Sequence, residues 1–233
     1  MEKKEPIILS LGGSLIIPNG GIDVNFLKKF YTFIHQEVAA GRRFFIVCGG
    51  GATCRHYQEN AQAVMGHQLT YDDIDWIGIH ATRLNAHLLR TIFRDISHRQ
   101  IIHHYDKKYM NITKPVAIAA GWKPGWSTDY CATKLAQEYK IKILINMSNV
   151  KMVYNKDPKK FPDARPIREW KWEKYRQLVG EKWIPGMNLP FDPIAAALGL
   201  KINLKVIILD GSNLRNLKRC IEGQKFIGTT ITP

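Results

Sequence analysis

Residues 6–14 read PIILSLGGS, an apolar run that ends in two glycines and a serine. The same order returns in RFFIVCGGG at 43–51 and in PVAIAAGW at 115–122. Continuous apolar runs of this length are typical of parallel strands that are covered on both faces of a sheet. Glycine after such a strand lets the backbone approach a ligand, and the amides that open the next helix favour an anion. The three turns predict a phosphate-type ligand at one edge of a sheet.

Amphipathic stretches alternate with the apolar runs along the rest of the chain. The predicted strands are 6–11, 43–48, 115–119, 141–146 and 204–209. The predicted helices are 23–40, 52–65, 72–97, 127–139, 193–199 and 212–222. Strand alternating with helix predicts an α/β fold with ligands at the carboxyl ends of the strands. The stretch FIGTTI at 226–231 predicts a last strand, antiparallel and at an edge of the sheet.

The chain shows no internal repeat and no linker, which predicts a single domain over residues 1–233. Its least regular part, 156–193, is rich in proline and tryptophan. Prolines break regular structure, so this part is predicted to form loops with one short helix around 169–179. We interpret it as a lobe of the same domain.

The composition excludes several classes of protein. Of 233 residues, 45% are hydrophobic and 23% are charged, which favours a buried core over disorder or a low-complexity scaffold. No apolar run approaches the roughly 20 residues that a membrane span needs. The apolar stretch at 7–11 is too short for a signal peptide, and the four cysteines lack zinc-binding spacing. We therefore expect a cytoplasmic protein with reduced cysteines and no membrane contact.

The charge of the chain is strongly positive. It holds 34 Lys and Arg against 20 Asp and Glu, a formal net charge of +14. Such a charge suits nucleic acid, a membrane surface or anionic small molecules. The excess at 151–182 and 201–225 is interrupted by acidic residues and lacks the aromatic spacing of an RNA-binding sheet. A solvated basic surface is the favoured interpretation, and we do not expect nucleic-acid binding.

Common catalytic motifs are absent from the sequence. GxxxxGK[ST] and GxGxxG do not occur, which disfavours a P-loop or a classical dinucleotide fold. G-x-S-x-G and H-E-x-x-H do not occur either. If the glycine turns bind a phosphate, these absences favour another kind of phosphate-binding site.

Five segments together carry a family resemblance. They are IILSLGGS, IVCGGGATCRHY, DWIGIHATRLNAHLL, AGWKPGWSTD and VYNKDP, and their order resembles the amino-acid kinase superfamily, most closely the archaeal-like UMP kinases. The most specific piece is D-x-x-G-x-x-A-[ST]-x-x-N at 75–85. The resemblance implies a three-layer αβα sandwich with a mainly parallel sheet. It also implies Mg²⁺-dependent transfer of the γ-phosphoryl group of ATP to UMP, with an acceptor side in about 1–130 and a nucleotide side in about 131–233.

The resemblance also assigns roles to individual residues. For UMP it implies binding by Gly49, Gly50, Gly51, Arg55, Asp75, Ser127 and Thr128, with Arg55 on the phosphate and Asp75 on the ribose. For ATP it implies Gly13, Ser14, Tyr154 and Asp157, and for catalysis Gly12, Gly13 and Asp129, with Ser10 at the position of the family's lysine. Asn149 and Lys151 on the ATP side and Lys123 for catalysis are further candidates, from their places beside these motifs. No metal-ligand set is predicted beyond Mg²⁺ that accompanies ATP. Asp129 either organises that cation or caps a helix, and the helix at 72–97 is expected to join subunits of a dimer-based homo-oligomer, such as a hexamer.

Two places depart from the family pattern: the first strand, and residues 148–153, which read SNVKMV where bacterial members read TKVDGV. The first strand of the family normally carries a lysine that neutralises the transferring phosphoryl group, and this chain has Ser10 there. Lys123 and Lys151 are the candidates for a cation that has moved. Two alternatives follow: a nucleotide-binding protein of the same fold without efficient transfer, or a kinase of the superfamily with another small acceptor. The acceptor-side residues are all present, which favours an active enzyme.

Overall fold

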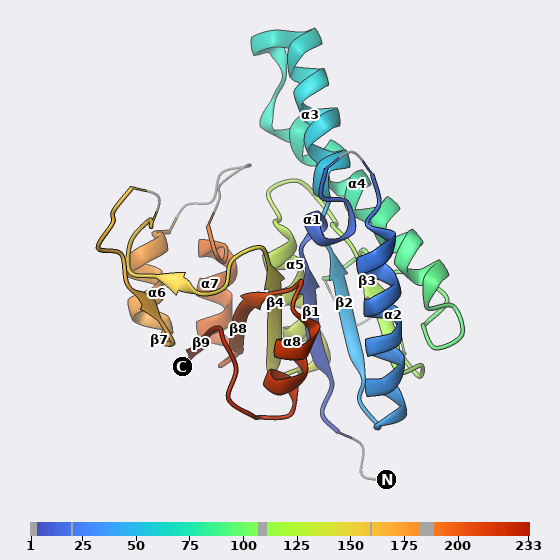
Figure 1. Cartoon of the computed structure of the whole chain (residues 1–233). Helices are drawn as coiled ribbons and strands as arrows, with labels where there is room; N and C mark the ends of the chain where they lie inside the picture. The colour runs from blue at the N-terminus through green and yellow to red at the C-terminus, as the bar shows by residue number, and fades with distance from the viewer. Residues whose placement is uncertain (1–3, 20, 107–110, 159, 182–188) are drawn as a thin grey trace.

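A seven-stranded sheet forms the middle layer of the protein (Figure 1). The computed structural model describes residues 4–19, 21–106, 111–158, 160–181 and 189–233. In spatial order the strands are β3 (Val116–Ala119), β2 (Phe44–Cys48), β1 (Ile7–Leu11), β4 (Ile143–Ser148), β8 (Lys205–Asp210), β9 (Thr229–Thr232) and β7 (Glu169–Lys171). The first five run parallel, β9 is antiparallel to β8, and β7 is parallel to β9.

Helices cover both faces of this sheet. One face carries α2 (Val24–Ala39), α4 (Tyr71–Ile92) and α8 (Leu214–Ile221), and the other carries α5 (Thr128–Tyr139), α6 (Trp172–Val179) and α7 (Pro193–Lys201). Alternate residues of β1 enter the two cores: Leu9 packs with Phe30 and Phe93, whereas Ile8 packs with Leu135. The α/β class and the three-layer arrangement are therefore confirmed. No helix in the described ranges is long and apolar enough to cross a membrane.

The remaining elements lie near the ends of the strands. They are α1 (Gly13–Ile16), α3 (Gly51–Met65), the 3₁₀ turn η1 (Gly66–Gln68), and an antiparallel ribbon of β5 (Val153–Tyr154) and β6 (Pro166–Ile167). Figure 1 shows α3 and the start of α4 projecting together from the body. Ala52 is the one residue of α3 that is fully buried. This helical hairpin therefore presents most of its surface to solvent.

Three predictions about the elements were wrong by more than one or two residues or in the position of a strand. The helix predicted to reach Ser97 ends at Ile92, because the following residues turn and Ser97 bridges to Val116 beside β3. The strand in FIGTTI is antiparallel as predicted, but it is not an edge strand, since β7 pairs with its outer side. The helix predicted around 169–179 begins at Trp172, because 169–171 form β7.

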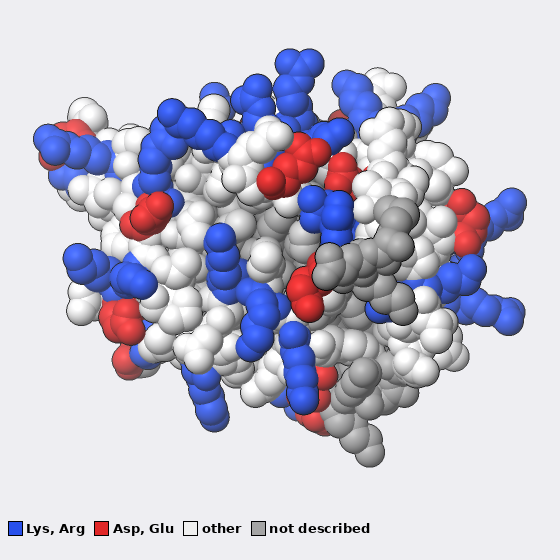
Figure 2. Space-filling model, turned by 90° about the horizontal axis from the view of Figure 1, so that it is seen from below, with Lys and Arg blue, Asp and Glu red and all other residues white. Residues whose placement is uncertain are grey.

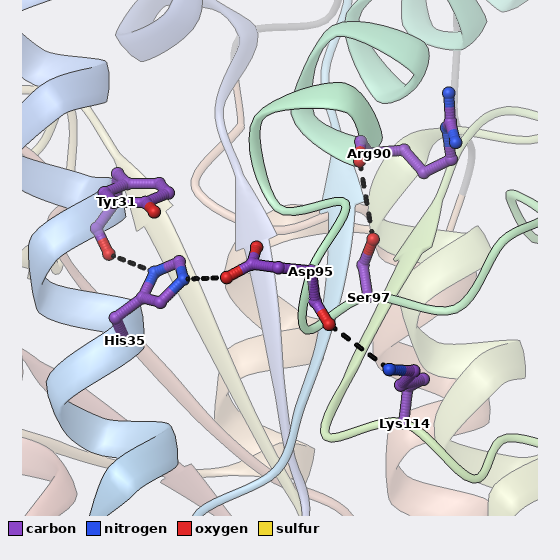
Figure 3. A network of polar contacts seen from close by, with 6 residues as sticks. All are labelled: Tyr31, His35, Arg90, Asp95, Ser97 and Lys114. Atoms are coloured by element: carbon purple, nitrogen blue, oxygen red, sulfur yellow. Dashed lines mark hydrogen bonds and ion pairs between the residues drawn. The ribbon is translucent and has the colours of Figure 1, made fainter.

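A hydrogen-bonded network ties α2 to the connection between α4 and β3 (Figure 3). His35 Nδ1 lies 3.0 Å from the carbonyl oxygen of Tyr31, and its Nε2 lies 2.9 Å from Asp95 Oδ2. Both partners are acceptors, so the ring donates to both only when it carries two protons. The bond from His35 lowers the pKa of Asp95. Lys114 Nζ donates to the Asp95 carbonyl at 3.2 Å and fixes the same connection from the other side.

The start of α4 is held by a capping box. Thr70 Oγ1 accepts a hydrogen bond from Asp73 N at 3.2 Å, and Asp73 Oδ2 accepts one from Thr70 N at 3.0 Å. These two bonds satisfy amides that the helix itself leaves unpaired. They fix where α4 begins, and α4 carries several residues of the site described below.

We predict that Thr70→Ala lowers the free energy of unfolding by about 1 kcal/mol, because the helix loses its N-cap. The matched control is Thr32→Ala, inside α2, where the threonine hydroxyl bonds only the Lys28 carbonyl of its own helix. Alanine favours a helix interior, so the control should not lose stability. Urea unfolding of both variants measures the difference. Equal losses in the two variants would contradict the capping role.

Candidate active site

The glycine turns after β1 and β2 touch one another at the carboxyl edge of the sheet. Gly49 N donates to the Leu11 carbonyl at 2.9 Å. A Cβ on Gly13 would lie 2.0 Å from Gly51 N, so any side chain at this position would force the backbone of the second turn to move. Gly51 also has φ of +68°, a conformation that L side chains rarely adopt. Glycine is therefore required at this contact for steric reasons, and it brings the start of α3 next to the end of β1.

Helix α4 supports the second of these turns. Asn85 is buried, and its Nδ2 donates to the Gly49 carbonyl at 2.8 Å and to the Gly50 carbonyl at 3.1 Å. One turn earlier, Thr82 Oγ1 accepts a bond from Gly121 N at 2.8 Å. A single helix face thus holds both the β2 turn and the loop after β3.

A cavity of about 280 Å³ opens beside these turns, between α3, α4 and the loop after β3. It is lined by Gly50, Cys54, Asp75, Gly78, Ile79, Thr82, Gly121, Trp126, Ser127, Thr128, Asp129, Leu189 and Asp192. Three aspartates contribute to this lining, and no Lys or Arg of the described residues does. The start of α5 faces the same space, and its amides favour an anion. The cavity thus combines anion-binding amides with carboxylates.

Asp75 closes one side of the cavity. Its Oδ2 accepts a hydrogen bond from Gly125 N at 2.7 Å, which links α4 to the loop before α5. Partial burial raises the pKa of Asp75, while the bond from Gly125 opposes that rise. The carboxylate is therefore held in place and keeps a second oxygen for a ligand hydroxyl.

Two further carboxylates meet at the opposite side of the cavity. Asp129 Oδ2 accepts a bond from Asp192 N at 3.2 Å, and Asn146 Nδ2 donates to Asp129 Oδ1 at 3.3 Å. Burial raises the pKa of Asp129 to about 7, and the neighbouring Asp192 carboxylate adds to the rise. Burial also raises the pKa of Asp192, against the hydrogen bond from Ser127 and those from the α7 amides. This pair can hold a proton or a cation.

Ser127 and Asp192 are the N-caps of the two helices that begin beside the cavity, α5 and α7. Ser127 is the N-cap of α5, with Tyr130 N donating to its Oγ at 3.0 Å. The alternative in which Asp129 caps this helix was therefore wrong. Asp192 caps α7 and accepts bonds from Ile194 N and Ala195 N at 2.6 and 2.9 Å. Oδ1 of Asp192 is thus occupied by the cap of α7.

Ser10 lies deep in the sheet, close to the two carboxylates. It is 4% exposed, and the register of β1 and β4 places it beside Asn146. Parallel register directs both side chains to the face covered by α5. Ser10 and Asn146 therefore lie side by side behind Asp129, outside the cavity lining, and the position where the resemblance implies an amine is uncharged.

The predicted cations lie outside the lining of the cavity. Arg55 follows the β2 turn by one helical turn, is exposed, and donates from Nη2 to the Pro18 carbonyl at 3.2 Å. It is at the rim, directly after the lining residue Cys54. Lys123 is exposed, and its Nζ lies 4.2 Å from the ring centroid of Trp122 and 4.9 Å from that of Trp126. Cation–π attraction holds the Lys123 amine on these indoles.

The residues predicted for ATP form a second group at the carboxyl end of β4. Gly12 N donates to the Met147 carbonyl at 2.9 Å, so the β1 turn adjoins this end. Asn149 and Lys151 are exposed in the connection to β5, where Tyr154 lies. The cavity lining includes none of the described residues Ser14, Asn149, Lys151, Tyr154 and Asp157. The structure therefore separates the two predicted groups, with the β1 turn between them.

Several lining residues were missed from the sequence. Trp126 packs edge to face against Trp122 and Tyr130, with ring centroids 4.8 and 4.5 Å apart. Its place in AGWKPGWSTD was the only signal. Leu189, in the lining, carries no local signal in the sequence. Asn146 is outside the lining and reaches the site only by donating to Asp129, so its contribution depends on which elements become neighbours.

A pocket of this composition, at the carboxyl edge of a parallel sheet and surrounded by glycine turns, defines the class of nucleotide- and phosphate-binding α/β proteins. Comparison with known proteins is more specific. The profile of the amino acid kinase family matches residues 5–210. The chain belongs to this family.

The similarity to related proteins covers almost the whole chain. The uridylate kinase of Pyrococcus abyssi is 30% identical over 229 residues, which cover 97% of this chain and 99% of the relative. That of Methanospirillum hungatei is 29% identical, covering 97% and 94%. The crystal structure of uridylate kinase from Archaeoglobus fulgidus matches with a TM-score of 0.81 at 28% identity, covering 97% of this chain and 99% of that one. The resemblance seen in the motifs is therefore confirmed.

We predict that stability falls as pH rises from about 5 to about 8, in part through Asp129. Since the pKa of Asp129 is raised to about 7 in the folded protein, the folded state holds a proton that the unfolded chain has lost above about pH 4. The preference for the folded state is lost as pH approaches and passes about 7, and this contributes on the order of 2 kcal/mol. Asp129→Asn should flatten that slope, measured by urea unfolding at both pH values.

The matched control is Asp73→Asn. Hydrogen bonds from Thr70 lower the pKa of Asp73, so this carboxyl titrates below the tested range, its partner does not titrate, and its loss should leave the slope unchanged. A slope in Asp129→Asn that equals that of the unmodified protein would show that Asp129 does not carry the raised pKa.

Proposed function

We propose that the protein is a UMP kinase that transfers the γ-phosphoryl group of ATP to UMP and forms UDP. The observation that carries the proposal is the acceptor cavity, where Asp75 faces the β2 glycine turn and is fixed by Gly125. The nearly full-length likeness to uridylate kinases in sequence and structure supports it. Together they favour a nucleoside monophosphate as the acceptor.

The acceptor would be bound from both ends. The free oxygen of Asp75 suits a ribose hydroxyl, and the start of α3 with Arg55 suits a phosphate. Arg55 is held by one exposed hydrogen bond, from Nη2 to the Pro18 carbonyl at 3.2 Å. Breaking this bond would let the guanidinium reach over the rim of the cavity to the phosphate. Ser127 and Thr128, at the start of α5, add hydroxyl groups for the base or the phosphate.

Transfer would depend on positioning and electrostatics, without a covalent intermediate. Mg²⁺ prefers oxygen ligands and commonly uses one or two carboxylates together with substrate phosphates. Asp129 and Asp192 provide such carboxylates, and the described residues hold no group of three or more potential metal ligands. The donor set therefore fits Mg²⁺ that arrives with ATP, whose charge would neutralise the phosphates where Ser10 offers none. The residues at 149–157 would hold the nucleotide.

The test is UMP-dependent formation of ADP from MgATP, with CMP, dTMP, AMP and GMP as competing acceptors. We predict that Arg55→Ala raises KM for UMP by about 10- to 100-fold, because a charge-assisted bond to phosphate is lost. Arg94→Ala, an exposed arginine after α4, is the control and should leave KM unchanged. Preference for another acceptor, or equal KM changes in both variants, would contradict the assignment.

A second candidate function is nucleotide binding without efficient transfer. It is favoured by Ser10 and by the absence of Lys and Arg from the described lining of the cavity. A transition state that spreads negative charge normally requires a positive group nearby. Calorimetric binding of UMP with no turnover in the same preparation would support this candidate over the kinase.

We also propose that the α3–α4 hairpin forms the interface of a homo-oligomer built from dimers. Tyr57 and Val64 lie two helical turns apart on α3 and are 68% and 84% exposed, and Trp76 and Leu84 are exposed along α4. Apolar residues gathered on a projecting hairpin are typical of an interface rather than of a free surface. A second copy can bury them by isologous contact.

We predict that Tyr57→Glu combined with Val64→Glu gives a monomer in light scattering, where the unmodified protein gives a dimer or a larger assembly. Buried carboxylates without partners oppose the contact. Phe161→Glu changes an exposed aromatic residue in the distant lobe and should not alter the mass. A monomeric unmodified protein would refute the proposal.

A further inference from the structure

Basic side chains gather at the amino edge of the sheet, opposite the active site. All five parallel strands begin at this edge, and each is preceded or opened by a cation. These cations, the amino-edge row, are Lys4 before β1, Arg42 and Arg43 before β2, Lys114 before β3, Lys140 and Lys142 before β4, and Lys201 and Lys205 at β8. Figure 2 looks onto this edge and shows Lys and Arg side chains spread across it, with fewer Asp and Glu between them.

Backbone contacts show that members of the row are neighbours. Lys205 N donates to the Lys142 carbonyl at 3.0 Å, across β8 and β4. On the other side of β1, Ile7 N donates to the Arg43 carbonyl at 3.0 Å, and Arg43 Nη2 donates to the Lys114 carbonyl at 3.5 Å. Adjacent strands lie about 4.8 Å apart, so five strands spread the row over roughly 20 Å.

The fold accounts for only part of this charge. Arg42 pairs with Glu37 at 2.9 Å. Lys140 is the C-cap of α5 and Lys201 is the last residue of α7, positions where a cation offsets the helix dipole. Across the described ranges, no carboxylate forms an ion pair with Lys142 or Lys205. Both are exposed at the start of strands, where no helix end requires them.

The surface is hollowed where the row reaches β3. A depression of about 740 Å³ there is lined by His87, Arg90, His98, Arg99 and Lys114, together with two uncharged residues. Among the described residues, none that lines this depression carries a carboxylate. The row thus continues into a concave, basic end rather than into a flat one.

We propose, against the expectation drawn from the sequence, that the amino-edge row binds the phosphodiester backbone of a nucleic acid without reading its bases. A linear series of cations matches a linear series of phosphates, and contacts between such cations and phosphates carry no base specificity. The hollow at β3 can receive a backbone, whereas a flat lipid surface would not fill it. This site lies at the other edge of the sheet from the proposed kinase site and does not depend on that function.

The experiment measures fluorescence anisotropy of a labelled DNA duplex of about 24 base pairs, of mixed sequence, and of a single-stranded RNA of similar length. If about six cations contact phosphates, log Kobs should fall against log salt concentration with a slope of about −5 for the duplex. Sequence changes in the probe should have no effect. No binding of either probe at about 50 mM salt would overturn the proposal.

Two triple variants separate the row from net charge. Lys140→Glu with Lys142→Glu and Lys205→Glu should weaken binding by about 30-fold or more and reduce the salt slope by about 3. Lys28→Glu with Lys29→Glu and Arg215→Glu makes the same change in charge at exposed residues of α2 and α8 and should weaken binding by no more than about 3-fold. Equal weakening in both variants would assign the binding to net charge and refute the row.

Two further measurements complete the test. Far-UV circular dichroism and UMP-dependent turnover report whether the variants are folded, since none of the six positions contributes to the proposed kinase site. Flotation with phosphatidylcholine and phosphatidylglycerol vesicles tests the lipid alternative. Capture by vesicles that depends on the row, without binding of either nucleic acid, would overturn the proposal in favour of a membrane.

Discussion

The contact between the glycine turns after β1 and β2 is the constraint on which the rest of the active site depends. Any Cβ at Gly13 or Gly51 would overlap the backbone of the other turn. Their approach sets the start of α3 beside the end of β1, and Asn85 then fixes α4 to the same turn through two carbonyls. Asp75 belongs to that helix, so its position opposite Gly125 follows from the contact. The acceptor cavity is thus a consequence of the close backbone contact between the turns that follow β1 and β2.

The charge of the cavity is opposite to that of the protein. The chain carries +14, yet the described lining holds three aspartates and no Lys or Arg. The surrounding positive field can attract anionic ligands from a distance, but it does not neutralise a phosphate inside the cavity. Positive charge must therefore come from the rim, through Arg55, or with the ligand, as Mg²⁺. Ser10 and Asn146 are buried and neutral, so the strand position where the family carries an amine supplies no positive charge either.

The sequence was sufficient for the parts of the structure that are local. Each parallel strand is a short apolar run followed by a turn, so five strands and the three glycine turns were predicted near their observed places. Prediction failed where the structure of a segment depends on the strand beside it. The lobe folds back so that β7 pairs with β9. As a result, the predicted helix begins later than expected, and β9 is not the edge strand. The site divides in the same way. Asp75 lies in a recognisable motif, whereas Asn146 becomes a site residue only through its register with Ser10.

The two edges of the sheet show why the glycine turns were visible in the sequence and the amino-edge row was not. Parallel topology gathers whatever lies at equivalent ends of the strands, so it collects the glycine turns at one edge and the cations at the other. A strand followed by glycines is an uncommon local pattern, but a lysine before a strand is ordinary, and eight such cations scattered over 200 residues attract no notice. The topology also limits the row. β3 ends the sheet on one side, and on the other β9 runs antiparallel to β8, so its first residue lies at the catalytic edge. The length of the row is therefore a property of the fold.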